Sequence, residues 1–148
     1  MIFLLDTDIL IVAMRGLKSA KTTERKRAEG IVDRCQQELA KGNRVAISAV
    51  TVSELEYGAC RSGQYPTEIV AVHKILSPFD VLAYDAIDCP AHYGRIRHDL
   101  EIRGVAIGGM DLMIAAHGVA LGATVVTNNV SHFSRVVGLQ VVNWLAAR

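Results

Sequence analysis

Three acidic side chains and one amide stand at places in the sequence where they could gather around a cation. Asp6 directly follows an apolar run, Glu54 lies one turn into a segment with helical spacing, Asp111 opens a late apolar segment, and Asn129 follows a β-branched run. Two unit charges about 4 Å apart repel each other by about 4 kcal/mol at an effective dielectric constant near 20. Three clustered carboxylates are therefore unfavourable unless a divalent cation lies between them.

Carboxylate oxygens are the ligands that Mg²⁺ and Mn²⁺ prefer. Such an ion can activate water, orient a phosphodiester and neutralise the charge on the leaving oxygen. We therefore predict that Asp6, Glu54 and Asp111 are catalytic residues and metal ligands. Three polar neighbours are predicted to support them: Thr7, Asp8 and Asn129.

Each of these residues also has a purely structural explanation. Asp6 or Asp8 could cap a helix, because aspartate is favoured at that position, and Asp111 could do the same. Glu54 alone is typical of a solvated helix face. The pair Asn128-Asn129 is typical of a turn. The metal hypothesis therefore depends on the fold bringing these side chains together.

Short apolar or β-branched runs alternate with segments of helical spacing along the chain. Strands are predicted at Ile2 to Leu5, Val45 to Ser48, Val81 to Ala83, Thr124 to Thr127 and around Val141 and Val142. Helices are predicted after Asp6 and at Glu24 to Lys41, Val50 to Arg61, Pro66 to Leu76, Asp85 to Arg103 and Asp111 to Leu121. Pro90 should kink the fifth of these helices unless it falls in the first turn.

This alternation predicts an α/β fold with a mainly parallel sheet covered by helices on both faces. Parallel neighbours need crossover connections, which the helices supply. Functional sites in such sheets form beyond the carboxyl ends of the strands. We therefore expect Asp6, Glu54, Asp111 and Asn129 to meet at one edge of the sheet.

Length and composition limit the possible classes of protein. The 148 residues are enough for one compact domain, which we predict over residues 1–148, and the net charge of +1 means that any contact with nucleic acid must be local. Cys35, Cys60 and Cys89 have no C-x-x-C spacing and are expected to be reduced thiols. No apolar run reaches the roughly 18 residues of a membrane span, and the first residues lack the features of a signal peptide. A cytoplasmic location is therefore expected.

Five stretches follow one another in a recognisable order. They are Phe3 to Asp8, Val52 to Ala59, Tyr93 to Arg97, Gly109 to His117, and Thr127 to Asn129 leading into His132 to Val136 and Asn143-Trp144. In residues and order they resemble the successive motifs of VapC-type PIN-domain toxins. Residues 16 to 44 and 62 to 80 carry no motif, and the first of these regions resembles an expansion of a part that is usually shorter in the family.

The resemblance implies a three-layer α/β/α PIN-like fold and an endoribonuclease that acts on structured cellular RNA. Mg²⁺ or Mn²⁺ would be bound by Asp6, Glu54 and Asp111. A cognate VapB-like antitoxin would cover the acidic site, often by inserting an arginine, and the toxin would form a homodimer. Many PIN domains have a fourth acid where this chain has Asn129, which implies that a second metal ion would be held weakly. VapC-like members often share this Asn-Asn variant.

Basic residues provide candidate contacts for the RNA backbone, because arginine binds phosphate through two parallel hydrogen bonds. The predicted contacts precede the Asp111 segment: Arg95, Arg97 and Arg103. A second basic cluster is better explained as a solvated helix face: Lys18, Lys21, Arg25, Lys26 and Arg27. His117 lies on an apolar helix and is expected to be packed or hydrogen-bonded, and no histidine is assigned to catalysis.

Two other functions stay open from the sequence. A haloacid-dehalogenase-like phosphatase also has an apolar strand followed by two aspartates spaced as Asp6 and Asp8 are. That family has Thr or Val two positions after the second acid, where this chain has Leu10, and it leaves Glu54 unexplained. The other alternative is a noncatalytic α/β binding module whose acids only cap helices. Metal-dependent cleavage of RNA distinguishes the three.

Overall fold

The computed structural model describes residues 1–145 and contains a five-stranded sheet in which neighbouring strands are parallel. The strand order is β3-β2-β1-β4-β5. The strands are β1 (Ile2–Leu5), β2 (Arg44–Ser48), β3 (Asp80–Leu82), β4 (Thr124–Val126) and β5 (Gln140–Val142). The predicted parallel sheet is confirmed, and the first strand of the chain lies at its centre.

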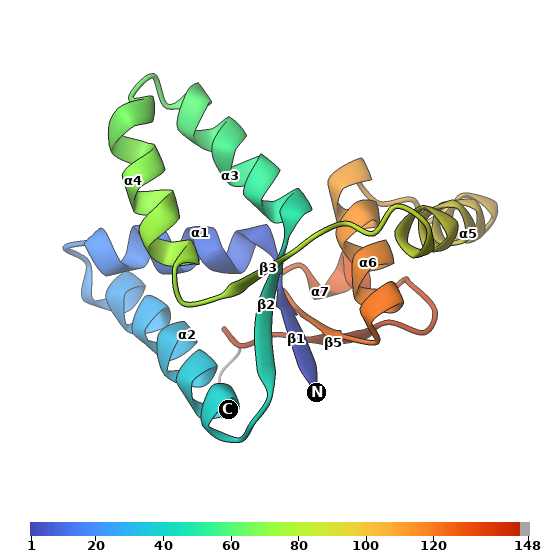
Figure 1. The fold of residues 1–148 in the computed structure, drawn as a ribbon, viewed down its shortest axis with the longest axis horizontal. Coiled ribbons are helices and arrows are strands. Elements are labelled where there is room, and N and C mark those ends of the chain that lie inside the picture. Colours follow the sequence, from blue (N-terminus) through green and yellow to red (C-terminus); the bar gives the residue numbers. More distant parts are fainter. Residues whose placement is uncertain (146–148) are drawn as a thin grey trace.

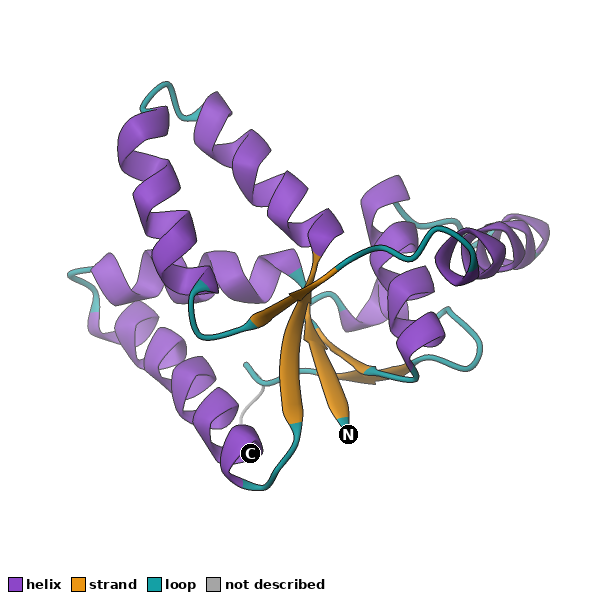
Figure 2. Cartoon of the chain, in the orientation of Figure 1, coloured by secondary structure: helices purple, strands orange, loops and turns teal. Residues whose placement is uncertain are grey.

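Seven helices in residues 1–145 accompany the strands. They are α1 (Thr7–Lys18), α2 (Thr22–Ala40), α3 (Ala49–Arg61), α4 (Tyr65–Leu76), α5 (Asp88–Ile102), α6 (Gly109–Leu121) and α7 (Val130–Phe133). Helices α1 to α4 lie on one side of the sheet and α5 to α7 on the other (Figures 1 and 2). In this part of the chain no helix combines the length and apolarity that a membrane crossing requires.

Two apolar cores fill the space between the sheet and its helix layers. Phe3 and Leu5 pack into the core beneath α1, α2 and α4, whereas Leu4 packs into the core beneath α5 and α6. Because successive strand residues face opposite sides, a strand covered on both faces must be apolar throughout. This explains the run at the start of the chain, and the predicted three-layer α/β/α architecture is confirmed.

The region without a recognised motif, residues 16 to 44, forms the end of α1, all of α2 and the start of β2. The two helices approach each other closely at Gly16. A Cβ atom there would lie 2.5 Å from the carbonyl oxygen of Glu24 and 2.6 Å from the Cβ of Ala28. Only glycine therefore permits this contact, which fixes the direction in which α2 leaves α1.

Some helix boundaries differ from the predicted ones. Helix α5 begins at Asp88 rather than at Asp85, whose side chain instead accepts hydrogen bonds from the backbone N–H groups of Ile87 (2.8 Å) and Asp88 (2.7 Å). Pro90 falls in the first turn, where a backbone N–H has no partner within the helix, so no kink is required. The short helix α7 was not predicted. The three cysteines are free, as expected.

Candidate active site

Asp6 lies at the carboxyl end of β1 and is almost fully buried, with 4% of its surface exposed. One carboxylate oxygen accepts a hydrogen bond from the backbone N–H of Thr7 (2.8 Å), and the other accepts one from the hydroxyl of Thr127 (2.9 Å). The residue is thus the N-cap of α1, as one explanation held. Capping uses only one of its oxygens, so the other is held towards the neighbouring strand β4.

Asp8 lies in the first turn of α1 and faces the segment that follows β4. Its Oδ2 accepts a hydrogen bond from the backbone N–H of Asn128 (3.2 Å). Its Oδ1 is buried and has no hydrogen-bond partner in residues 1–145. A buried carboxylate oxygen without a donor is costly, so this atom indicates a place where a positive charge would be favourable.

Asp111 lies in the first turn of α6, but the N-cap of that helix is Gly108. The explanation of Asp111 as a cap is therefore wrong, and its side chain faces α7. The Asn129 side-chain amide donates a hydrogen bond to Oδ2 of Asp111 (3.3 Å), and Nδ1 of His132 lies 3.2 Å from the same oxygen. The predicted Asn129 thus holds a predicted acid in place.

Glu54 projects from α3 towards the start of α1. The hydroxyl of Thr7 donates a hydrogen bond to its Oε1 (2.7 Å) and lies 3.2 Å from the hydroxyl of Thr51. Since Thr7 follows Asp6 directly, Glu54 is linked to the buried acid through one residue. Figure 1 shows why these segments meet: the starts of α1 and α3 lie together at the ends of β1 and β2.

Burial and electrostatic repulsion act together on Asp6 and Asp8 at the start of α1. Burial raises the pKa of Asp6 to about 8, and the charge of Asp8 and the weaker influence of Asp111 act in the same direction. The pKa of Asp8 is also raised, first by burial and then by the charge of Asp111. A cation placed beside Asp6 and Asp8 would therefore stabilise the ionised form of both carboxyl groups.

The donor set fits a hard divalent cation such as Mg²⁺ or Mn²⁺. It consists of carboxylate oxygens, one of which is buried without a partner, and of nearby amide groups. The side chains of the described residues, as they are placed, include no group of three His, Cys, Asp or Glu residues that could hold a metal ion. Asp6, Asp8 and Asp111 influence one another electrostatically, while Glu54 is joined to them through Thr7.

The three arginines predicted to contact RNA lie on or at the end of α5 and bind neighbouring groups. Arg97 forms an ion pair with Glu101 (2.9 Å), and Arg103 forms one with Asp99 (2.6 Å). Arg95 lies 2.7 Å from a ring nitrogen of His92. Within the described chain, none of them bonds to Asp6, Asp8, Glu54 or Asp111. Their proposed contact with RNA stays a prediction.

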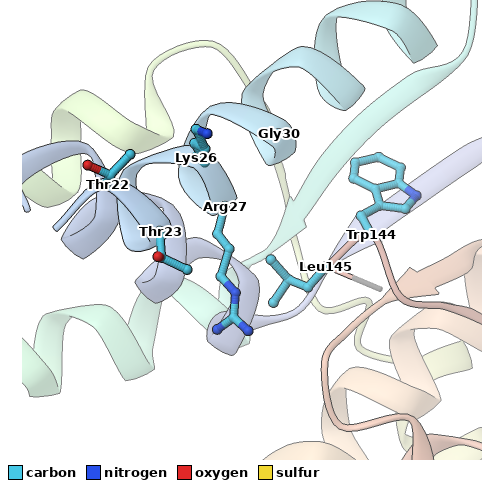
Figure 3. A pocket seen from close by; sticks show the side chains of 7 residues that line it. All are labelled: Thr22, Thr23, Lys26, Arg27, Gly30, Trp144 and Leu145. Carbon is cyan, nitrogen blue, oxygen red and sulfur yellow. The ribbon is translucent and has the colours of Figure 1, made fainter. Parts of the chain in front are cut away.

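Part of the second basic cluster borders a hollow of about 370 Å³ between α2 and the segment after β5. Figure 3 shows Lys26 and Arg27 on α2 opposite Trp144 and Leu145. Arg34, farther along α2, lies over the Trp144 ring at 5.6 Å from its centroid. None of the residues that line this hollow belongs to the acidic site.

Of the five histidines, His117 was anticipated and His132 was missed. His117 is buried and its Nδ1 lies 2.8 Å from the hydroxyl of Ser48, so the expectation of a packed, hydrogen-bonded histidine is confirmed. His132 was assigned no role, yet it lies beside Asp111 and Asn129. The only local signal was its position three residues after Asn129, which places both on one face of a helical turn.

Comparison with known proteins gives consistent results. The PIN domain family matches residues 3–139 of this chain. Ribonuclease VapC2 of Rickettsia felis is 34% identical over 144 residues, which are 97% of this chain and 98% of the relative. The tRNA(fMet)-specific endonuclease VapC of Shigella flexneri is 37% identical over 142 residues, or 96% of this chain and 97% of the relative. A crystal structure of VapBC2 from Rickettsia felis, bound to a DNA fragment from its promoter, contains a chain with a TM-score of 0.84 and 33% identity, covering 97% of this chain and 99% of that one.

Proposed function

Because this chain belongs to the PIN domain family, we propose that it is a metal-dependent endoribonuclease, a VapC-like toxin that cuts structured cellular RNA in the cytoplasm. The observation that carries the proposal is the pair formed by the buried Asp6 and the half-buried Asp8 at the carboxyl edge of the sheet beside Asp111. The relatives named ribonuclease and endonuclease, at 34% and 37% identity over nearly the whole chain, support the choice of RNA as substrate.

We assign the metal ion, Mg²⁺ or Mn²⁺, to Asp6, Glu54 and Asp111. When bound, the ion would activate water and neutralise the charge that develops on the leaving oxygen. The other polar residues of the site orient these acids: Thr127 holds Asp6 and Thr7 holds Glu54. Asn129 and His132 hold Asp111, as ligand-orienting partners do in metal sites.

The partner we propose is a VapB-like antitoxin that covers the acidic site and places a cation there. Solved VapBC structures of relatives at 33% and 34% identity support this partner. The unpartnered oxygen of Asp8 and the raised pKa of Asp6 make a guanidinium group favourable at this position. A homodimer is proposed from the family resemblance, and sedimentation velocity would measure it.

The direct test is incubation of the purified chain with transfer RNA and with total RNA, in the presence of Mg²⁺, Mn²⁺ or EDTA. We expect endonucleolytic products with either metal, none with EDTA, and loss of cleavage when the purified antitoxin is added. Release of phosphate from a small monoester without cleavage of RNA would instead identify a phosphatase. If neither RNA cleavage nor phosphate release is observed, the noncatalytic binding module is the remaining alternative.

His132 is expected to influence the reaction through Asp111. Replacing it by alanine removes a group 3.2 Å from the Asp111 carboxylate, so that acid is held less firmly. Loss of such a partner lowers metal affinity or activity by roughly 10–100-fold in metal enzymes. We expect an effect in this range on Mn²⁺ affinity, measured by calorimetric titration, together with a lower rate of RNA cleavage. His98→Ala on α5, an exposed histidine with no contact to the acids, is the control. If the two variants bind Mn²⁺ equally well, His132 has no such role.

A further inference from the structure

A groove of about 660 Å³ reaches Glu54 of the acidic site and runs between α1, α3 and α4. Glu54 forms part of its wall, so the groove and the site share a residue. Figure 1 shows α3 and α4 as a pair of helices that extends away from the sheet next to α1. A nucleic-acid chain whose cleaved phosphodiester bond lies at the acidic site could therefore continue along this groove.

Three cations line the groove: Arg15 and Lys18 on α1 and Arg61 on α3. All three are exposed, and none of their side chains forms an ion pair or hydrogen bond with residues 1–145. The acids in the groove are Glu54, which binds Thr7, and Glu68. Uncompensated cations beside an acidic metal site fit a chain of phosphates, because each phosphate can bind one of them in place of released salt ions.

Tyr57 gives the groove an aromatic surface. It lies between Glu54 and Arg61 on α3 and is 66% exposed, which is unusual for a large side chain with an apolar ring. Exposed aromatic rings between cations are typical of surfaces that bind single-stranded nucleic acid, where unpaired bases stack on them. By contrast, Arg97 on α5 and Arg103 at its end are already paired with Glu101 and Asp99.

We infer that this groove is the RNA-binding track of the enzyme. The inference rests on the proposed function: Arg15, Lys18 and Arg61 bind phosphates on one side of the cleaved bond, and Tyr57 stacks on an unpaired base. Cleavage chemistry stays with the acids, and the groove supplies affinity and orientation. The track predicts a preference for RNA with an unpaired segment next to the cleavage position.

The test compares the wild type with a variant carrying Arg15→Ala, Lys18→Ala and Arg61→Ala. We expect KM for an RNA with an unpaired loop to rise about tenfold or more while kcat changes little, since the metal site is untouched. In an Asp111→Asn background, where RNA is bound but not cut, fluorescence anisotropy gives the dependence of affinity on salt. The slope should become shallower by about 2, since each lost phosphate contact on a single strand contributes about 0.7.

Two further variants sharpen the result. Tyr57→Phe should bind RNA like the wild type and Tyr57→Ala more weakly, because only the ring is needed for stacking. Arg44→Ala removes a cation at the amino end of β2, on the opposite edge of the sheet, and should change neither KM nor the salt slope. Melting curves of all variants confirm that they fold.

The outcomes separate this inference from the proposed function. If the wild type neither binds nor cuts RNA, both fail. If the wild type cuts RNA and the groove variants keep the wild-type KM and salt slope, the groove does not bind RNA, whereas the proposed endoribonuclease activity is supported. Loss of antitoxin binding by groove variants that still bind RNA normally would assign the groove to the antitoxin. An effect confined to Arg97→Ala and Arg103→Ala would place the RNA along α5.

Discussion

Replacing Asp6 or Asp111 by asparagine is expected to reduce RNA cleavage by at least about a thousandfold. A carboxylate ligand is lost in each case, and a bound metal ion supplies several kcal/mol of transition-state stabilisation, with each 1.36 kcal/mol equal to a factor of ten in rate. Asparagine has nearly the shape of aspartate but is a neutral and weaker ligand. Initial rates with Mg²⁺ and Mn²⁺ measure the loss.

Stability should change in the opposite direction from activity, most clearly for Asp6→Asn. Asp6 is buried beside Asp8, so the metal-free folded chain must either ionise Asp6 against burial and repulsion or keep it protonated, and an amide removes both costs. The amide oxygen can still accept the hydrogen bond from Thr7, and the amide NH₂ can donate to the Thr127 hydroxyl. Metal-free Asp6→Asn should therefore melt at a higher temperature than the wild type, and Mg²⁺ should stabilise it less.

Asp85→Asn is the matched control for both measurements. Asp85 accepts backbone hydrogen bonds at the start of α5 but lies outside the acidic cluster. Because asparagine caps a helix about as well as aspartate, this variant should cut RNA at the wild-type rate. If Asp6→Asn and Asp111→Asn behave like Asp85→Asn, with metal-induced stabilisation intact, these acids are not the metal ligands.

The free energy of unfolding of the metal-free protein should fall as the pH rises from about 4 to about 8. Asp6 has a pKa of about 8 in the folded chain against an ordinary value of 3.8, so the folded state binds more protons across this window. A rise in pH then favours the unfolded state, and the stabilisation is lost once Asp6 ionises. The expected change is on the order of a few kcal/mol, since each pKa unit corresponds to about 1.4 kcal/mol.

Mg²⁺ or Mn²⁺ should reverse this dependence, because the cation favours the ionised acids. Melting temperatures between pH 5 and pH 8, with EDTA and with metal, provide the measurement. The raised pKa of Asp8 acts in the same direction as that of Asp6. The pKa of His117 is lowered by burial, which removes stability as the pH falls, but this contribution is common to the wild type and Asp6→Asn. The melting temperature of Asp6→Asn should therefore depend less on pH than that of the wild type. If the two proteins show the same pH dependence, the pKa of Asp6 is not raised in the folded chain.

Much of the fold could be predicted from the sequence because the signals are local. The wholly apolar run before Asp6 indicates a strand covered on both faces, and alternation with helical segments indicates a parallel sheet. Once the sheet is parallel, residues that follow its strands must lie at one edge, which brings Asp6 and Asn129 near each other. Asp111 and Glu54 were singled out by the same rule together with the family resemblance.

Tertiary structure decided how these side chains meet. Spacing in the sequence does not show that Thr7 binds Glu54, since that contact joins α1 to α3 across 47 positions. Nor does it show that His132 reaches Asp111, because the turn that carries it is only four residues long and has no periodic pattern.

The charged neighbours of the arginines were decided partly by the sequence and partly by the tertiary structure. Arg97 and Glu101, like Asp99 and Arg103, stand four residues apart on the predicted helix, so their pairing follows from helical spacing, although it was not predicted. Arg15, Lys18 and Arg61, by contrast, come from two helices that only the packed layers bring together. Helix and strand periodicity determines which face a residue occupies. The partner on that face depends on crossovers and packing between layers, which join residues far apart in the chain.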